Sequence, residues 1–359
     1  MNIIIIILIF CCCCLIILGG GGYYYITSKD VNKPLDNKQD GSSTTNDSSL
    51  PTNTSIQQTT LKSITTLPPI LYPFTTHTFT NANATGRLGP TWSAIKSAYS
   101  SASWTQNDKY LNMINDNGIQ LWTVPRTGNY KIKAVGAAGI NSRKYCKGRD
   151  IEITTKLNKD EVIMILVGQM GSFGAYNNQS GGGGGTFVVR GTQSEPNAIL
   201  VAGGGGGSSD NNYNYVQNEN SNAAAPNTGN GNDGCEGGGG GGSDGSGGTN
   251  SAHSTGGAGL LGDSVGIPNY TSIKSQAKSF KNGGAGAEPE TNRIVGGFGG
   301  GGCSNNGESG GGGGGYSGGG GGGKNFNGGG GGSYSSLPKF IDNGAINGGH
   351  GKVVITFIN

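Results

Sequence analysis

The chain has 359 residues, and 24 lysines and arginines against 21 acidic residues leave a formal charge of +3. This near-neutral balance gives no electrostatic case for nucleic-acid binding. Glycine supplies 74 residues, about three times its usual share, which excludes an ordinary globular composition.

The first segment is apolar and long enough to cross a membrane. Residues 3–18 are uninterrupted apolar residues, and they are followed by a short glycine run, three tyrosines and Ile26. A helix of this length spans a bilayer, and tyrosines are typical of its interface. No basic start or small-residue cleavage site is obvious, so residues 1–26 favour an uncleaved transmembrane signal-anchor over a signal peptide. We expect the larger downstream part to be exposed outside, on a cell surface or a virion envelope.

Residues 27–72 are rich in Ser, Thr, Asn, Gln and Pro and predict a disordered stalk. Sequons for possible N-glycosylation occur here and further along the chain. They begin at Asn46, Asn53, Asn83, Asn178 and Asn269. Such matches arise by chance in an Asn-rich chain, so they support an exposed location only slightly.

Regular structure is expected from residue 73 to Asn359. A strand is predicted over residues 74–80, and a short helix follows in which Trp92, Ile95 and Tyr99 recur at helical spacing. Trp92 and Tyr99 suggest an aromatic ligand box, but this spacing is more typical of core packing. Residues 118–125, 130–136, 150–157, 161–168 and 352–358 are typical of antiparallel strands joined by turns. We therefore predict an all-β antiparallel sandwich that follows short N-terminal helices.

Glycine runs separated by short apolar pieces fill residues 168–351. A flexible linker is one interpretation, because glycine tracts behave as random coils. A linker has no use for the apolar residues 186–189, 199–202 and 294–295, which are typical of strands. If the runs are ordered, they favour extended threefold helices of the polyglycine-II type, whose peptide groups must bond to neighbouring segments. We expect the sandwich to carry a bundle of such helices as one long insertion.

Beyond the membrane segment only Cys146, Cys235 and Cys303 remain. Three cysteines allow one disulfide and one free thiol, and three pairings are conceivable. A possible disulfide between Cys235 and Cys303 is the pairing we favour.

Many short motifs match one family in order and spacing. They include Thr85-Gly86-Arg87-Leu88-Gly89-Pro90-Thr91, residues 118–125, residues 165–171 and residues 296–303. Through them, residues 74–357 resemble the glycine-rich extracellular region of the anaplastic lymphoma kinase and leukocyte tyrosine kinase receptors, a module that also occurs in bacterial and giant-virus surface proteins. The motif positions expected to be structural are Gly118, Trp122, Pro125, Gly128, Tyr130, Gly136, Gly168, Gly171, Cys303 and Gly351.

The resemblance implies a tumour-necrosis-factor-like β-sandwich that carries polyglycine helices. In the receptors this region binds small helical cytokines, but those contacts lie outside the matched motifs. This sequence differs from the receptors because its membrane segment precedes the domain. It also lacks the lysine strand, the His-Arg-Asp loop and the Asp-Phe-Gly of a kinase.

Catalysis is not indicated by the sequence. Residues 257–262 and 318–324 imitate nucleotide-binding motifs, but the abundance of glycine makes chance matches nearly certain. No nucleophile stands at a recognisable spacing from a base. We expect no enzyme, no cofactor and no metal site.

The sequence instead predicts a membrane-anchored surface module for binding or adhesion, with a protein or glycan partner. Residues 208–232 and 267–294 are the loops expected to carry recognition. One alternative is a structural coat protein of a virion or cell envelope. Another is a receptor-like ectodomain that captures a cytokine-like ligand.

Overall fold

The computed structural model describes residues 69–139, 146–174, 179–209, 219–226, 229–267, 273–291, 294–304 and 309–359. The predicted membrane segment and nearly all of the predicted stalk lie outside these ranges. The chain divides into two compact units, and every described residue belongs to the second, Thr65–Asn359. Among the described residues, no helix has both the length and the apolar character needed for a membrane span.

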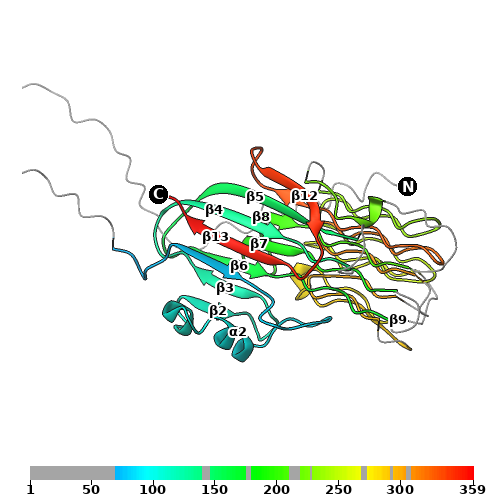
Figure 1. Cartoon of the computed structure of the whole chain (residues 1–359), viewed down its shortest axis with the longest axis horizontal. Helices are drawn as coiled ribbons and strands as arrows, with labels where there is room; N and C mark the ends of the chain where they lie inside the picture. Colours follow the sequence, from blue (N-terminus) through cyan, green and yellow to red (C-terminus); the bar gives the residue numbers. More distant parts are fainter. Residues whose placement is uncertain are drawn as a thin grey trace, which may run out of the picture. The chain divides into compact units, whose positions relative to one another are not determined.

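Two antiparallel sheets form the main architecture (Figure 1). The first sheet has the order β1 (Thr76–Phe79), β13 (Lys352–Phe357), β4 (Gly128–Val135), β5 (Gly148–Leu157) and β12 (Ile341–Asn347). The second has the order β11 (Tyr334–Ser335), β8 (Pro196–Ala202), β7 (Thr186–Gly191), β6 (Val162–Leu166), β3 (Gln120–Thr123) and β2 (Leu111–Met113).

The remaining elements are short. Strands β9 (Ile273–Ser275) and β10 (Glu288–Pro289) pair with each other. Helix α2 (Trp92–Ala98) is followed by the 3-10 turns η1 (Ser103–Gln106), η2 (Glu219–Ser221) and η3 (Phe280–Asn282). The predicted helix is thus confirmed, although its α-helical part ends at Ala98.

The main core lies between the two sheets. In β4, Tyr130, Ile132 and Ala134 are buried, whereas Lys131 is exposed and Lys133 is half-buried, as a strand with one covered face requires. Inward-facing residues of the second sheet, such as Trp122, complete this core. The predicted all-β class and the packing of antiparallel sheets as a sandwich are confirmed.

The central strands of the second sheet, β6 to β8, are buried on both faces. Its outer face contributes Met164, Phe187 and Val201 to a second core, which also contains Leu260 and Phe298 from the glycine-rich region. Because both faces are covered, β6 to β8 have nearly continuous apolar sequences and lack polar alternation. The glycine-rich region is therefore packed onto the sandwich.

The two ends of the sandwich differ. At one end, turns of four residues connect β3 with β4, β5 with β6, and β7 with β8. At the other end, β4, β6 and β8 lead directly into glycine-rich segments (Figure 1). The described chain begins and finishes at the turn end, where Leu71 N donates to Pro125 O at 3.0 Å and Asn129 N donates to Asn359 O at 2.6 Å.

Two sequence predictions are wrong. Ile294 and Val295 form no strand; their carbonyl groups accept from Ser304 N at 3.1 Å and Ser172 N at 2.9 Å within the glycine-rich region. The glycine-rich region is also not one insertion, because sandwich strands β7, β8 and β12 interrupt it. Residues 136–139, which precede the expected range, join it as well, since Ala137 N donates to Gly184 O at 3.0 Å.

Candidate binding site

An open hollow of about 590 Å³ lies where helix α2 meets the β2–β3 hairpin. We name it the corner hollow, and it is lined by Thr91, Trp92, Ser93, Asn112, Met113, Asn115 and Asp116. Asp116 is the one charged residue of this lining. The hollow therefore presents amide, hydroxyl and carboxylate groups around a half-buried indole ring.

Helix α2 is fixed to the hairpin at its first turn. Thr91 is the N-cap residue, and its Oγ1 accepts a hydrogen bond from Ala94 N at 3.3 Å. Asp116 Oδ1, from the hairpin, accepts one from Trp92 N at 2.8 Å. Helix-initial N–H groups lack partners inside the helix, so these two bonds set where the helix begins. They also hold Trp92 against the hairpin.

The hairpin turn projects two polar side chains. Asn115 and Asp116 have φ angles of 43° and 53°, and Asn117 N donates to Ile114 O at 2.9 Å. Asn and Asp tolerate this left-handed conformation better than most residues. Both side chains are exposed at the rim of the corner hollow.

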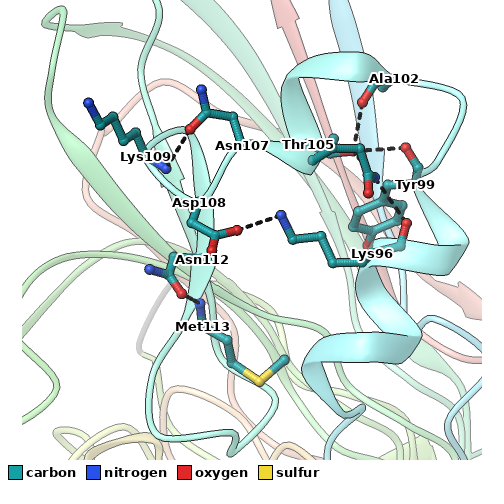
Figure 2. Close-up of polar contacts among 10 residues, drawn as sticks. Lys96, Tyr99, Ala102, Thr105, Asn107, Asp108, Lys109, Asn112 and Met113 are labelled. Atoms are coloured by element: carbon teal, nitrogen blue, oxygen red, sulfur yellow. Dashed lines mark hydrogen bonds and ion pairs between the residues drawn. The ribbon is translucent and has the colours of Figure 1, made fainter.

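Lys96 fixes the indole ring from the helix side. Its Nζ lies 4.5 Å from the Trp92 ring centroid and 2.6 Å from Asp108 Oδ1. Figure 2 shows this ion pair beside Asn112, whose Oδ1 accepts from Met113 N at 2.8 Å. Among the described residues, no hydrogen-bond partner is present for the Asn112 amide nitrogen or the Asn115 side chain. Two amides at the hollow thus retain unused hydrogen-bonding capacity.

Trp92 and Tyr99 do not form a common ligand box. Tyr99 is 5% exposed, and its hydroxyl accepts from Thr80 N at 2.7 Å and donates to Thr80 O at 3.2 Å. Trp92 packs partly against the same core but also lines the hollow. The core interpretation therefore holds fully for Tyr99 and in part for Trp92.

Two histidines have structural surroundings. The His77 ring lies edge-on to Phe79, Tyr99 and Trp104 at centroid distances of 4.7, 4.7 and 5.0 Å. Burial lowers the pKa of His77 to about 4. His350 Nδ1 accepts a hydrogen bond from Met170 N at 3.1 Å, and burial lowers its pKa as well. Both rings are therefore neutral at pH 7; His77 packs among aromatic rings, and His350 serves as a hydrogen-bond acceptor.

The predicted motif glycines lie at close backbone contacts. A Cβ atom would collide with the Gly203 carbonyl at Gly136, the Gly184 carbonyl at Gly168, and the Gly181 carbonyl at Gly171. The other three meet different neighbours. Gly118 has φ +87° and faces Gly89, Gly128 faces Phe357 and Asn359, and Gly351 faces Thr186 and Val135.

The remaining motif residues except Cys303 lie at the turn end or in the main core. Trp122 and Tyr130 are both fully buried, with ring centroids 5.8 Å apart at an interplanar angle of 78°. Tyr130 OH donates to Arg126 O at 2.7 Å. Pro125 O accepts from Leu71 N, so this turn holds the start of the described chain.

The glycine-rich segments bond to one another with a period of three. Gly182 and Gly185 both donate to one neighbouring segment, at Gly302 O and Gly299 O, each at 2.9 Å. Between them, Gly183 donates to a second segment and Gly184 to a third. The same period recurs in other runs. In each of these runs, two glycines three positions apart donate to carbonyl groups of one neighbouring segment. The pairs are Gly312 and Gly315 to Thr255 and Ala258, Gly328 and Gly331 to Gly207 and Gly204, and Gly320 and Gly323 to Asn232 and Cys235.

The favoured disulfide is wrong. Cys303 is a free, fully buried thiol that packs beside Ala258, and its Sγ accepts from Thr255 Oγ1 at 3.7 Å. Cys235 lies in different surroundings, with its Sγ 3.8 Å from Ser221 Oγ. Burial raises the pKa of the Cys303 thiol to about 12, so it is protonated and unreactive at neutral pH.

Several other predicted positions fall outside the described residues. Asn46, Asn53, Asn178 and Asn269 are among them, as are residues 210–218, the centre of the first predicted recognition loop. Asn83 is described, and it is exposed at a turn with φ 63°. The corner hollow was missed because no sequence signal connects Trp92 with Asp116, which is 24 residues away.

No family model matches the chain. A segment of 97 residues, 26% of the chain, is 36% identical to the leukocyte tyrosine kinase receptor of Mus musculus. Part of this chain resembles a receptor. The match covers 11% of the receptor's length. The similarity is a distant one to a segment of the receptor's extracellular region. The resemblance predicted from the motifs is thus supported for part of the chain, and the receptor's own activity is not transferred by it.

Proposed function

We propose that this chain is a membrane-anchored surface module that binds or adheres to a partner and has no enzymatic activity. The observation that carries the proposal is the corner hollow, where two side-chain amides with remaining hydrogen-bonding capacity line the same hollow as a half-buried indole ring. Concave sites with a few placed polar groups on a rigid scaffold are typical of binding sites. The distant similarity to a receptor segment supports an extracellular location, and residues 1–26 would supply the anchor.

We also propose that the glycine-rich segments are polyglycine-II helices on a tumour-necrosis-factor-like sandwich. The polyglycine-II helix has about three residues per turn and no internal hydrogen bonds, so its N–H groups point to successive neighbours around the axis. The period of three in the bonding of Gly182 to Gly185 supports this conformation, because a β-strand alternates its partners with a period of two. A flexible linker would not produce such a period.

Packing of the glycine-rich segments against one another would make them a stiff support. Each segment bonds to several others, so bending one requires breaking bonds to its neighbours. A rigid support reduces the entropy that is lost when a partner is bound, which favours affinity. The sandwich and the glycine-rich segments would therefore hold the binding loops in fixed positions.

The proposal is tested by the binding of the full-length chain to intact cells. We expect the binding of the chain to these cells to saturate at nanomolar to micromolar concentrations of the chain. Abundant self-association without a saturable partner would instead favour a structural coat protein. Competition with the true receptors for a helical cytokine would favour the third possibility, a receptor-like ectodomain that captures such a ligand.

A further inference from the structure

The Trp92 ring is a fixed aromatic surface at the corner hollow. Its backbone is bonded to Asp116, and Lys96 lies over the ring at 4.5 Å. Lys96 is itself paired with Asp108 (Figure 2). Trp92 is partly buried against the main core, and it lines the hollow together with Met113. A partly exposed aromatic ring that is held in one orientation suits a flat apolar ligand face, such as the C–H face of a sugar ring.

The polar groups around the ring suit a ligand with many hydroxyl groups. Asn112 and Asn115 supply amide donors, while the Thr91 and Ser93 hydroxyls, which bond to each other at 3.1 Å, line the same hollow. An amide or hydroxyl group can donate and accept, as sugar hydroxyls do. This arrangement allows hydrogen bonds in both directions around one ring.

The charges of the corner hollow select against ionic ligands. Asp116 is the one charged residue of the lining, so it would repel a phosphate or sulfate group. The nearby Lys96 ammonium is already paired with Asp108 at 2.6 Å. Asp116 Oδ1 is engaged by Trp92 N, and a single engaged carboxylate is a weak site for a cation. A neutral ligand therefore fits best.

We propose that the corner hollow binds a neutral saccharide, with one sugar ring against Trp92 and its hydroxyls bonded to Asn112 and Asn115. This inference rests on the proposed binding function and names the chemical class of its ligand. The hollow of about 590 Å³ falls in the size range of small-molecule sites, and because it is open to solvent the rest of a saccharide chain can extend outward.

The test uses the full-length chain on an array of neutral and charged glycans, followed by titration with the best neutral sugar. The variant combines Asn112→Ala with Asn115→Gly, because glycine keeps the left-handed turn while removing the amide. A matched control is Asn325→Gly, which changes another left-handed asparagine, at φ 65° in the glycine-rich region. We expect the double variant to bind about tenfold more weakly and the control to bind like the wild type.

Trp92→Leu provides a second measurement, in which the sugar-induced change in tryptophan fluorescence should disappear. Circular dichroism of each variant shows whether it is folded. If Trp92→Leu is not folded, the single variant Asn115→Gly replaces it in the binding measurement. Equal binding by the wild type and the double variant would overturn the saccharide site, as would the absence of neutral sugars among the bound glycans. If saturable cell binding persists in either case, the binding function stands and only its ligand class is wrong. Absence of any saturable cell binding by the wild type would overturn both the saccharide site and the binding function.

Discussion

Gly184 shows at the scale of one residue why glycine is required in the packed runs. A Cβ atom there would lie against Phe298 O, far inside the distance that real Cβ atoms reach, and backbone cannot move aside as a side chain can. By contrast, a Cβ atom at Gly240 would meet its nearest atoms at 3.7 and 3.8 Å, which is ordinary contact. Similar sequence surroundings thus contain positions of opposite tolerance.

We expect Gly184→Ala to lower the free energy of unfolding by about 3 kcal/mol, because packed backbone must separate. The matched variant Gly240→Ala should be neutral or stabilise by up to about 1 kcal/mol, since alanine restricts the unfolded chain more than glycine. Denaturant unfolding of the full-length variants measures both values. Equal effects at the two positions would contradict the packed arrangement.

His77 gives a pH dependence at the same scale. Its pKa is about 4 in the folded protein and 6.5 in a model peptide, so the unfolded state binds more protons between these values. The stability contributed by neutral His77 is fully present above pH 6.5 and is lost as the pH falls toward 4. We expect the wild type to lose up to about 3 kcal/mol more than His77→Phe over this window. Denaturant titrations at pH 7, 5 and 4 would show parallel curves if this assignment were wrong.

At the scale of the element, the sequence was most informative where a strand has an apolar face. Strands β4, β5 and β13 were predicted because apolar residues alternate or cluster in them. Strand β12 was missed, since Ile341–Asn347 contains glycine and asparagine and its pairing with β5 is interrupted twice by register shifts. Such irregularity is common at a sheet edge, where it discourages pairing with other chains.

An ion pair holds β12 to β5. Arg149 donates from Nε and Nη2 to Asp342 at 2.8 and 2.5 Å, and the two side chains are 16% and 24% exposed. Burial alone would raise the pKa of Asp342, but the bonds from Arg149 and Gly344 outweigh it and lower the pKa. The local sequence of β12 does not indicate this bond, because its two residues lie 193 positions apart.

We expect Asp342→Asn to destabilise the protein by about 1 to 2 kcal/mol, since a forked, charge-assisted bond is weakened. The matched control is Asp108→Asn, which breaks the ion pair with Lys96, because Asp108 is 68% exposed and such pairs contribute below about 1 kcal/mol. Thermal unfolding of both variants tests this order. A larger loss at Asp108 would refute it.

At the scale of the whole molecule, the sequence predicted the existence of the sandwich but not how the glycine-rich region joins it. The bonding partners of Gly182 to Gly185 come from segments more than a hundred residues away as well as nearby ones, and runs of identical residues carry no pairing information. Apolar residues such as Phe298 and Leu260 join the region to the second sheet. Their isolated positions between glycines give little signal in a sequence.

We expect the amides of Gly182 to Gly185 and Gly311 to Gly315 to exchange slowly, because their bonds open only when neighbouring segments separate. Strands β4 and β5 provide an internal reference for protection. Hydrogen exchange followed by mass spectrometry of the full-length chain measures both. Exchange of the glycine amides within seconds, with the strands still protected, would show that these segments are not packed in solution.

Leu71 bonds to Pro125 in the turn before β4, and Asn359 bonds to Asn129 at the start of β4. A host protein could therefore carry this domain as a cassette within one of its own surface loops, because both junctions would emerge on the same side. Tandem copies of the domain could likewise be joined by short linkers. The glycine-rich segments leave from the opposite end, so evolution could lengthen or shorten them without disturbing either junction.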